Sequence, residues 1–117
     1  MNVDRRAIGS AAEQIAAQFL EARGLVILER NFRCRAGEVD LIARHGETLV
    51  FVEVRLRAGD AFGGAAASVD ARKQAKLLRA ARYYLAGQPE QPCRCDVVAL
   101  DRLDANRIEW IRDAFSA

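Results

Sequence analysis

Residues 38–55 carry the pattern that most narrows the folds open to this chain. Over residues 38–43 one parity holds Val39, Leu41 and Ala43 and the other Glu38, Asp40 and Ile42. Over residues 48–55 one parity holds Val50, Val52 and Val54 and the other Leu49, Phe51, Glu53 and Arg55, and His45-Gly46 is a turn between the two runs. Alternation with a period of two predicts β-strands, and the short gap between them predicts an antiparallel hairpin. We therefore expect a β-sheet that contains this hairpin.

The register of the hairpin decides which side chains share a face. A turn on His45-Gly46 predicts the pairs Arg44–Glu47, Ile42–Leu49, Asp40–Phe51 and Glu38–Glu53. One face is then wholly apolar, with Val39, Leu41, Val50, Val52 and Val54. The other face grades from Ile42, Leu49 and Phe51 into Glu38, Asp40, Glu53 and Arg55. A register shifted by one residue would bury a carboxylate among valines, which costs several kcal/mol without a partner.

Asp40 and Glu53 form a candidate metal site on the polar face. The predicted register makes them diagonal neighbours with Cβ atoms roughly 7–8 Å apart. Clustered carboxylates repel one another unless a positive charge neutralises them, and hard oxygen ligands suit Mg²⁺ or Mn²⁺. The residues alone leave a second interpretation open, a surface ion-pair cluster with Arg55.

Apolar spacing elsewhere predicts two helices and further strands. The first helix runs from about residue 7 to 23 and ends at Gly24; the second begins at Ser68 or Asp70 and runs to about Leu85. Strands are expected at 25–28, 95–100 and 107–111, with a basic loop over 31–37 and a loop of small residues over 58–67. The expected order is α-β-β-β-α-β-β, an α/β fold.

Length and composition limit the classes of protein. A chain of 117 residues with 51% hydrophobic content predicts one domain over residues 1–117, and a net charge of +2 does not mark a strongly basic nucleic-acid binder. Three cysteines and the lack of an apolar signal segment predict reduced thiols and a cytoplasmic protein, with no membrane span. Cys34, Cys93 and Cys95 lack the second pair or nearby His of a zinc site.

Five motifs together resemble a known family. They are Gly9-Ser10-Ala11-Ala12-Glu13, Gly37-Glu38-Val39-Asp40-Leu41-Ile42, Phe51-Val52-Glu53-Val54-Arg55-Leu56-Arg57, Lys73 with Lys76, and Arg94-Cys95-Asp96-Val97-Val98. The combination resembles the YraN family and, more widely, the PD-(D/E)XK nuclease superfamily. The resemblance implies a restriction-endonuclease-like core, a mixed central sheet flanked by helices, similar to the archaeal Holliday-junction resolvases.

The same resemblance implies a catalytic centre. Asp40 and Glu53 would bind Mg²⁺ or Mn²⁺ with the backbone carbonyl of Val54, and Glu13 would approach from the first helix, where small neighbours let that helix sit close to the sheet. The implied activity is metal-dependent hydrolysis of phosphodiester bonds in DNA or RNA, branched structures included, and a homodimer is expected by analogy. For Glu13 and Glu38, solvated surface residues remain the alternative.

One position departs from the superfamily pattern. Arg55 stands where a Lys is expected, and a guanidinium stays protonated, so it can orient and stabilise but not act as a general base. Lys73 is a substitute cation from the second helix. The alternative function is therefore a catalytically degenerate module that binds nucleic acid without cleaving it, and a third is a protein adaptor using the 58–67 loop.

Basic side chains surround the carboxylates in the sequence. Those expected to contact nucleic acid are Arg33, Arg35, Arg57, Lys73 and Lys76, and Arg79 could extend the same phosphate-binding rim. Solvated charges on a helix are the alternative interpretation. His45 is expected to be a turn residue and Trp110 a core or edge aromatic.

Overall fold

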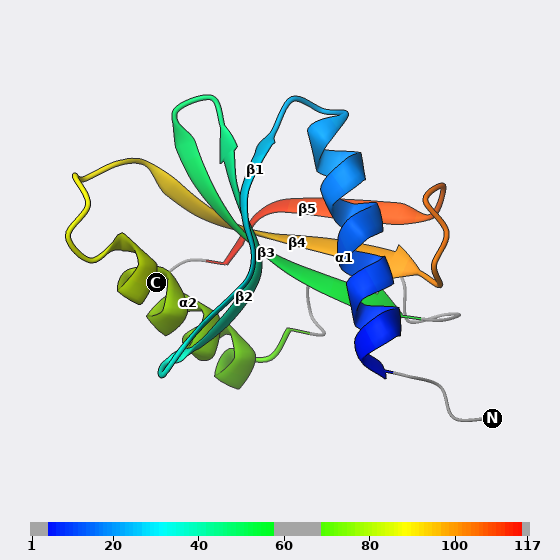
Figure 1. The fold of residues 1–117 in the computed structure, drawn as a ribbon, viewed down its shortest axis with the longest axis horizontal. Helices are drawn as coiled ribbons and strands as arrows, with labels where there is room; N and C mark the ends of the chain where they lie inside the picture. Colours follow the sequence, from blue (N-terminus) through cyan, green and yellow to red (C-terminus); the bar gives the residue numbers. More distant parts are fainter. Residues whose placement is uncertain (1–4, 58–68, 116–117) are drawn as a thin grey trace.

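Two helices and five strands make up residues 5–57 and 69–115, the parts of the chain that this computed structural model describes. In chain order the elements are α1 (Arg5–Glu21), β1 (Val26–Cys34), β2 (Gly37–His45), β3 (Thr48–Arg57), α2 (Ala71–Leu85), β4 (Cys93–Asp101) and β5 (Ile108–Phe115) (Figure 1). The expected order α-β-β-β-α-β-β is confirmed.

The strands form one mixed sheet in the order β1-β2-β3-β4-β5. All neighbours are antiparallel except β3 and β4, which run parallel. A parallel pair needs a long crossover between its strands, and α2 lies within that connection. The mixed sheet expected from the sequence is therefore confirmed.

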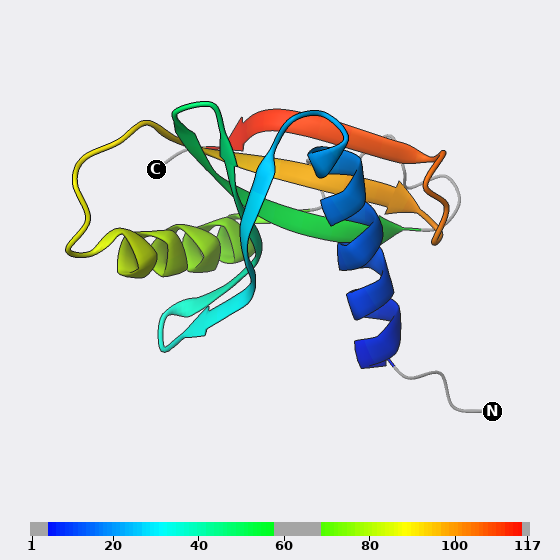
Figure 2. The same ribbon diagram turned by 45° about the horizontal axis from the view of Figure 1, so that its top comes forward.

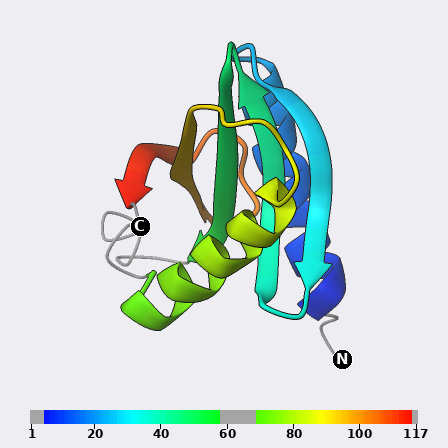
Figure 3. The ribbon, with the colours of Figure 1, turned by 90° about the vertical axis from the view of Figure 1, so that its left-hand side faces the viewer.

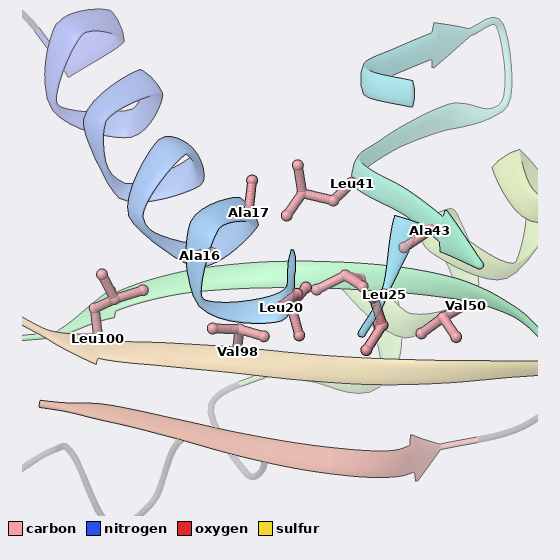
Figure 4. Close-up of a cluster of buried hydrophobic side chains, with 10 residues drawn as sticks. Ala16, Ala17, Leu20, Leu25, Leu41, Ala43, Val50, Val98 and Leu100 are labelled. Atoms are coloured by element: carbon pink, nitrogen blue, oxygen red, sulfur yellow. The ribbon is translucent and has the colours of Figure 1, made fainter. Parts of the chain in front are cut away.

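The helices cover opposite faces of the sheet (Figure 3). On one face α1 buries Ala16, Ala17 and Leu20 against Leu41, Val50, Val52, Val98 and Leu100 (Figure 4). On the other face α2 buries Leu77, Ala80 and Ala81 against Ile42, Leu49, Phe51 and Cys95. Successive strand residues thus point alternately into the core beneath α1 and the core beneath α2, as a period of two requires.

The helix ends follow local sequence signals. Gly24, just after α1, has φ +92°, a left-handed conformation that glycine adopts without strain. Of the two predicted caps of α2, Asp70 serves, since its side chain accepts a hydrogen bond from the N–H of Lys73 at 2.9 Å. Ser68 and the predicted 58–67 loop lie outside the described residues. No helix in the described parts is long and apolar enough to span a membrane.

The predicted loop over residues 31–37 is wrong for its first four residues, because β1 continues to Cys34. Its pairing with β2 includes Arg33 opposite Glu38 and Cys34 opposite Gly37. A register shift between Ile27 and Glu29 breaks the alternation, and most of this edge strand is exposed. Both effects hide the period-two signal on which the prediction relied.

The predicted hairpin register is wrong by two positions. The turn falls on Gly46 and Glu47, so His45 is the last residue of β2, opposite Thr48, rather than a turn residue. Gly46 has φ +62°, which the turn requires. A shift of two preserves which residues share a face, so the predicted faces of β3 are retained: Leu49 and Phe51 pack toward α2, whereas Val50 and Val52 pack toward α1.

The β1–β2 hairpin bends away from the rest of the sheet and over α2 (Figure 2). Gly37 has φ +155°, and a Cβ there would lie 2.8 Å from the carbonyl oxygen of Lys76. The bend also moves Val39 into the core beneath α2, so its predicted place on the face of Leu41 is wrong. The pairing of β2 with β3 stops at Leu41 opposite Val52.

Candidate active site

Asp40 and Glu53 lie where β2 and β3 separate. Each occupies the position next to the last pair of the ladder, Leu41 opposite Val52. The two acids therefore occupy facing positions, rather than the diagonal ones that the predicted register gave. The N–H of Val54 donates instead to Oδ2 of Asp40 at 2.8 Å. A side chain thus satisfies a backbone donor at the point where the strands part.

The environment of Asp40 disfavours its charged form. Burial is the main cause, and the negative charges of Glu53, Glu13 and Glu38 add to it; the Val54 N–H acts in the opposite direction. Together these effects raise the pKa of Asp40 to about 8. The four acids are therefore close enough to repel one another. Asp40 is both buried and exposed to the negative charges of the other three.

The environment of Glu53 also disfavours its charged form. Burial raises its pKa, and Glu38 and Glu13 act in the same direction, whereas Arg55 and Lys73 lower it. The nearest cation is Arg55, whose Nη1 lies 3.9 Å from Oε1 of Glu53. The side chains of Glu53 and Arg55 are only 20% and 18% exposed. A partial ion pair therefore offsets the burial of Glu53 incompletely.

Arg55 has hydrogen-bonding capacity to spare. Its Nε is buried and has no hydrogen-bond partner among the described residues. A buried donor without an acceptor is costly, and an anion in the adjoining cleft would satisfy it.

Glu13 reaches the same group of charges from α1. It is half-buried, and burial raises its pKa; a hydrogen bond from the Asn31 side chain and the charges of Arg33 and Arg30 lower it, whereas Glu38 raises it. Glu38 pairs with Arg33, Nε to Oε2 3.4 Å, and its side chain is 63% exposed. Glu38 is therefore a surface residue whose charge still acts on the buried acids.

A cleft of about 530 Å³ is lined by two of these acids, Glu38 and Glu53, whereas Asp40 and Glu13 are not among its lining residues. Its lining comes from the β1–β2 hairpin, β3 and α2, and includes Arg33, Glu38, Glu53, Arg55, Lys73 and Lys76. Three of the predicted nucleic-acid contacts thus share one cavity with Glu53. Arg35 is exposed at the turn after β1, and the side chain of Arg57 is outside the described part of the chain.

The side chains do not form a ready-made metal cage. Within residues 5–57 and 69–115, no group of three or more His, Cys, Asp and Glu side chains is arranged to hold a metal ion. All three cysteines are free. Any metal ion at this site would therefore be held by one or two side chains, together with backbone carbonyls, water or a bound phosphate.

Two contributors to the site escaped the sequence prediction. Asn31, which hydrogen-bonds Glu13, lay in the segment interpreted as a loop, and nothing in its neighbours Arg30 and Phe32 marked it as part of the site. Gly37 permits the close approach of the hairpin to α2, and its signal was a glycine at the start of a strand.

The family model and the individual relatives that match this chain name the same family. Residues 12–100 match the uncharacterised protein family UPF0102. A UPF0102 protein of Nitrosomonas europaea is 57% identical over 108 residues, which is 92% of each chain. One from Methylobacillus flagellatus is 50% identical over 110 residues, covering 94% of this chain and 97% of its own, and one from Hahella chejuensis is 51% identical over 111 residues. These matches confirm the resemblance to the YraN family, and the wider resemblance to the nuclease superfamily stays a prediction.

Proposed function

The chain belongs to the uncharacterised protein family UPF0102, and we propose that it is a divalent-metal-dependent endonuclease that hydrolyses phosphodiester bonds of DNA or RNA. One observation carries the proposal: two largely buried carboxylates, Asp40 and Glu53, lie together, and Glu53 lines a cleft whose rim is basic. Buried acids that lack compensating donors are typical of functional sites rather than of structural ion pairs.

The two acids fit Mg²⁺ or Mn²⁺. Both are oxygen ligands short of positive partners, and Mg²⁺ is commonly held by one or two carboxylates together with substrate phosphate and water. The carbonyl of Val54 is a further candidate ligand, because the N–H and C=O of one strand residue point the same way and this N–H points at Asp40. When bound, such an ion supplies charge neutralisation and activation of water for attack on phosphorus.

The cations of the cleft suit the phosphate. Arg55 has an unused buried Nε–H to donate to a phosphate oxygen, and its guanidinium remains charged throughout. The charge of Lys73 on α2 lowers the pKa of Glu53, and Lys73 lines the same cleft. Lys73 is therefore the candidate to replace the Lys that the nuclease pattern has at the position of Arg55. Arg33 and Lys76 extend the positive rim along the path of the backbone.

A second candidate function follows from Arg55. A residue that cannot give up its proton at this position also suits a module that binds nucleic acid without cleaving it. Such a module would bind equally well with and without divalent metal.

The test is cleavage of labelled linear, flapped and four-way DNA and RNA with Mg²⁺ or Mn²⁺. We expect activity in the wild type, and a loss of at least about 10³-fold in Asp40→Asn and Glu53→Gln. Glu47→Gln, at the exposed hairpin turn, is the matched control and should retain activity. A wild type that cleaves nothing in this panel, yet binds it in EDTA, would favour the binding module instead.

A further inference from the structure

One side of α2 carries a stripe of exposed side chains, and of these only Lys76 also lines the cleft of the proposed cleavage site. Arg72, Lys76, Arg79 and Tyr83 are all exposed, and their spacing of four, three and four residues aligns them along one side of the helix. The helix contains five basic residues and no acidic one. This surface is therefore complementary to a polyanion along its whole length.

Tyr83 adds an aromatic ring to the stripe. It is 59% exposed, and the centroid of its ring lies 6.4 Å from that of Phe32 on β1, with the ring planes inclined at 42°. Phe32 is held from behind, because Tyr84 meets it edge-on at 5.2 Å and Phe51 meets Tyr84 edge-on at 6.1 Å. The core thus fixes Phe32 and Tyr84, whereas Tyr83 is left with its ring open to solvent.

The ring lies within reach of a chain that occupies the cleft. Lys76 lines the cleft, and Tyr83 is seven residues further along the helix, a rise of about 10 Å. A stacked strand advances about 3.4 Å per nucleotide, so the separation corresponds to roughly three nucleotides. Arg79 stands between the two positions, where it can contact an intervening phosphate.

We propose that Tyr83, supported by Phe32, stacks on an unpaired base of a nucleic-acid strand whose phosphates follow Arg79 and Lys76 into the cleft. The inference deepens the proposed function by naming the substrate class, a single-stranded or locally unpaired segment. A base inside a duplex is covered on both faces by its neighbours and has no free face to offer Tyr83. The run of cations without an acid favours a nucleic acid over an apolar protein partner.

The experiment measures binding in EDTA, so that cleavage plays no part. Fluorescence anisotropy compares a labelled single-stranded 20-mer with a blunt duplex of the same length, for the wild type, Tyr83→Ala and Tyr83→Phe. Stacking on an aromatic side chain contributes enough affinity that Tyr83→Ala should raise the Kd for the single strand by roughly 5- to 150-fold. Tyr83→Phe keeps the ring and should stay within about 2-fold, and the Kd for the duplex should change in neither variant.

Leu103→Ala is the matched control, since Leu103 is also an exposed apolar side chain, 45% exposed, but lies in the connection between β4 and β5. Thermal melting checks that each variant is folded, and Tyr83→Leu, which keeps apolar bulk without a π-face, replaces Tyr83→Ala if the latter melts early. An unchanged single-strand Kd, or an equal loss on both nucleic acids, would overturn the proposal; binding of neither by the wild type would do the same.

The experiments can refute the stacking site and the cleavage site independently of each other. If Asp40→Asn abolishes cleavage while Tyr83→Ala binds single strands normally, the nuclease stands and the stacking site does not. If Tyr83→Ala weakens binding but no metal-dependent cleavage is found, the stacking site stands on a binding module.

Discussion

Two aspartates on the sheet are removed from solvent in opposite ways. Asp96 on β4 is 0% exposed and accepts from Nε of Arg94 at 3.1 and 3.2 Å, from Nε1 of Trp110 at 2.9 Å and from the N–H of Asp113 at 2.9 Å. Arg94 is itself held by His45, 2.9 Å from its Nη2. Every oxygen of Asp96 thus meets donors, and one of them is a cation.

Asp40 shows the contrary arrangement. One backbone N–H donates to it, and the charges that raise its pKa are three other acids. Asp96 is surrounded by hydrogen-bond donors that include a cation, whereas Asp40 is an acid whose charge the fold leaves poorly compensated. The contrast distinguishes a structural carboxylate from the one that the proposed function uses, without reference to any family, and three measurements test it.

The largest effect is expected at Asp96. Replacing it by Ala leaves the Arg94 guanidinium and the Trp110 N–H without their acceptor, so the free energy of unfolding should fall by about 3–5 kcal/mol. Urea denaturation measures this change. Glu90→Ala, in the exposed connection after α2, is the control and should stay within about 0.5 kcal/mol of the wild type. A loss below about 1 kcal/mol at Asp96 would show that the network contributes little.

A divalent ion bound at the proposed site of Asp40 and Glu53 should stabilise the protein, and the effect should depend on Asp40. At a Mn²⁺ concentration about 100 times its Kd, the free energy of unfolding should rise by about 2.7 kcal/mol, visible as a higher Tm. The rise should vanish in Asp40→Asn and remain in Glu47→Gln. An equal shift in all three proteins would mean that the ion binds elsewhere.

Much of the fold follows from local signals in the sequence. The helices were predicted because their apolar spacing and end signals, Gly24 and Asp70, act over a few residues. The pairing of Asp40 with Glu53 was predicted from the wrong register, since a shift of two residues leaves every side chain on its face. That prediction depended on which residues of each strand share a face, and not on the exact pairs across the hairpin.

The parts that failed depend on contacts between distant segments. The course of β1 beyond Arg30 and the place of Val39 are set by the hairpin bending over α2, and Gly37 against Lys76 is a contact across 39 residues of sequence. The cluster of Glu13 with Asn31 likewise joins α1 to β1. No periodicity within one element encodes such packing.

The last effect concerns the charge of Asp40 in the absence of metal. The pKa of Asp40 in the folded protein, about 8, lies above its ordinary value of 3.8, so the folded state binds this proton more tightly than the unfolded state does. The wild type therefore loses stability as the pH rises from about 4 to 8, and a neutral Asn at this position does not.

In EDTA at pH 8, Asp40→Asn should consequently be more stable than the wild type by at least about 1 kcal/mol, and the two proteins should converge near pH 4. Urea denaturation at a series of pH values measures the difference directly. Asn can still accept the Val54 N–H through its own oxygen, so the comparison isolates the charge. The same substitution at Asp96 should be destabilising at pH 8, because its donors include a cation; if both substitutions destabilise, the distinction between the two aspartates is wrong.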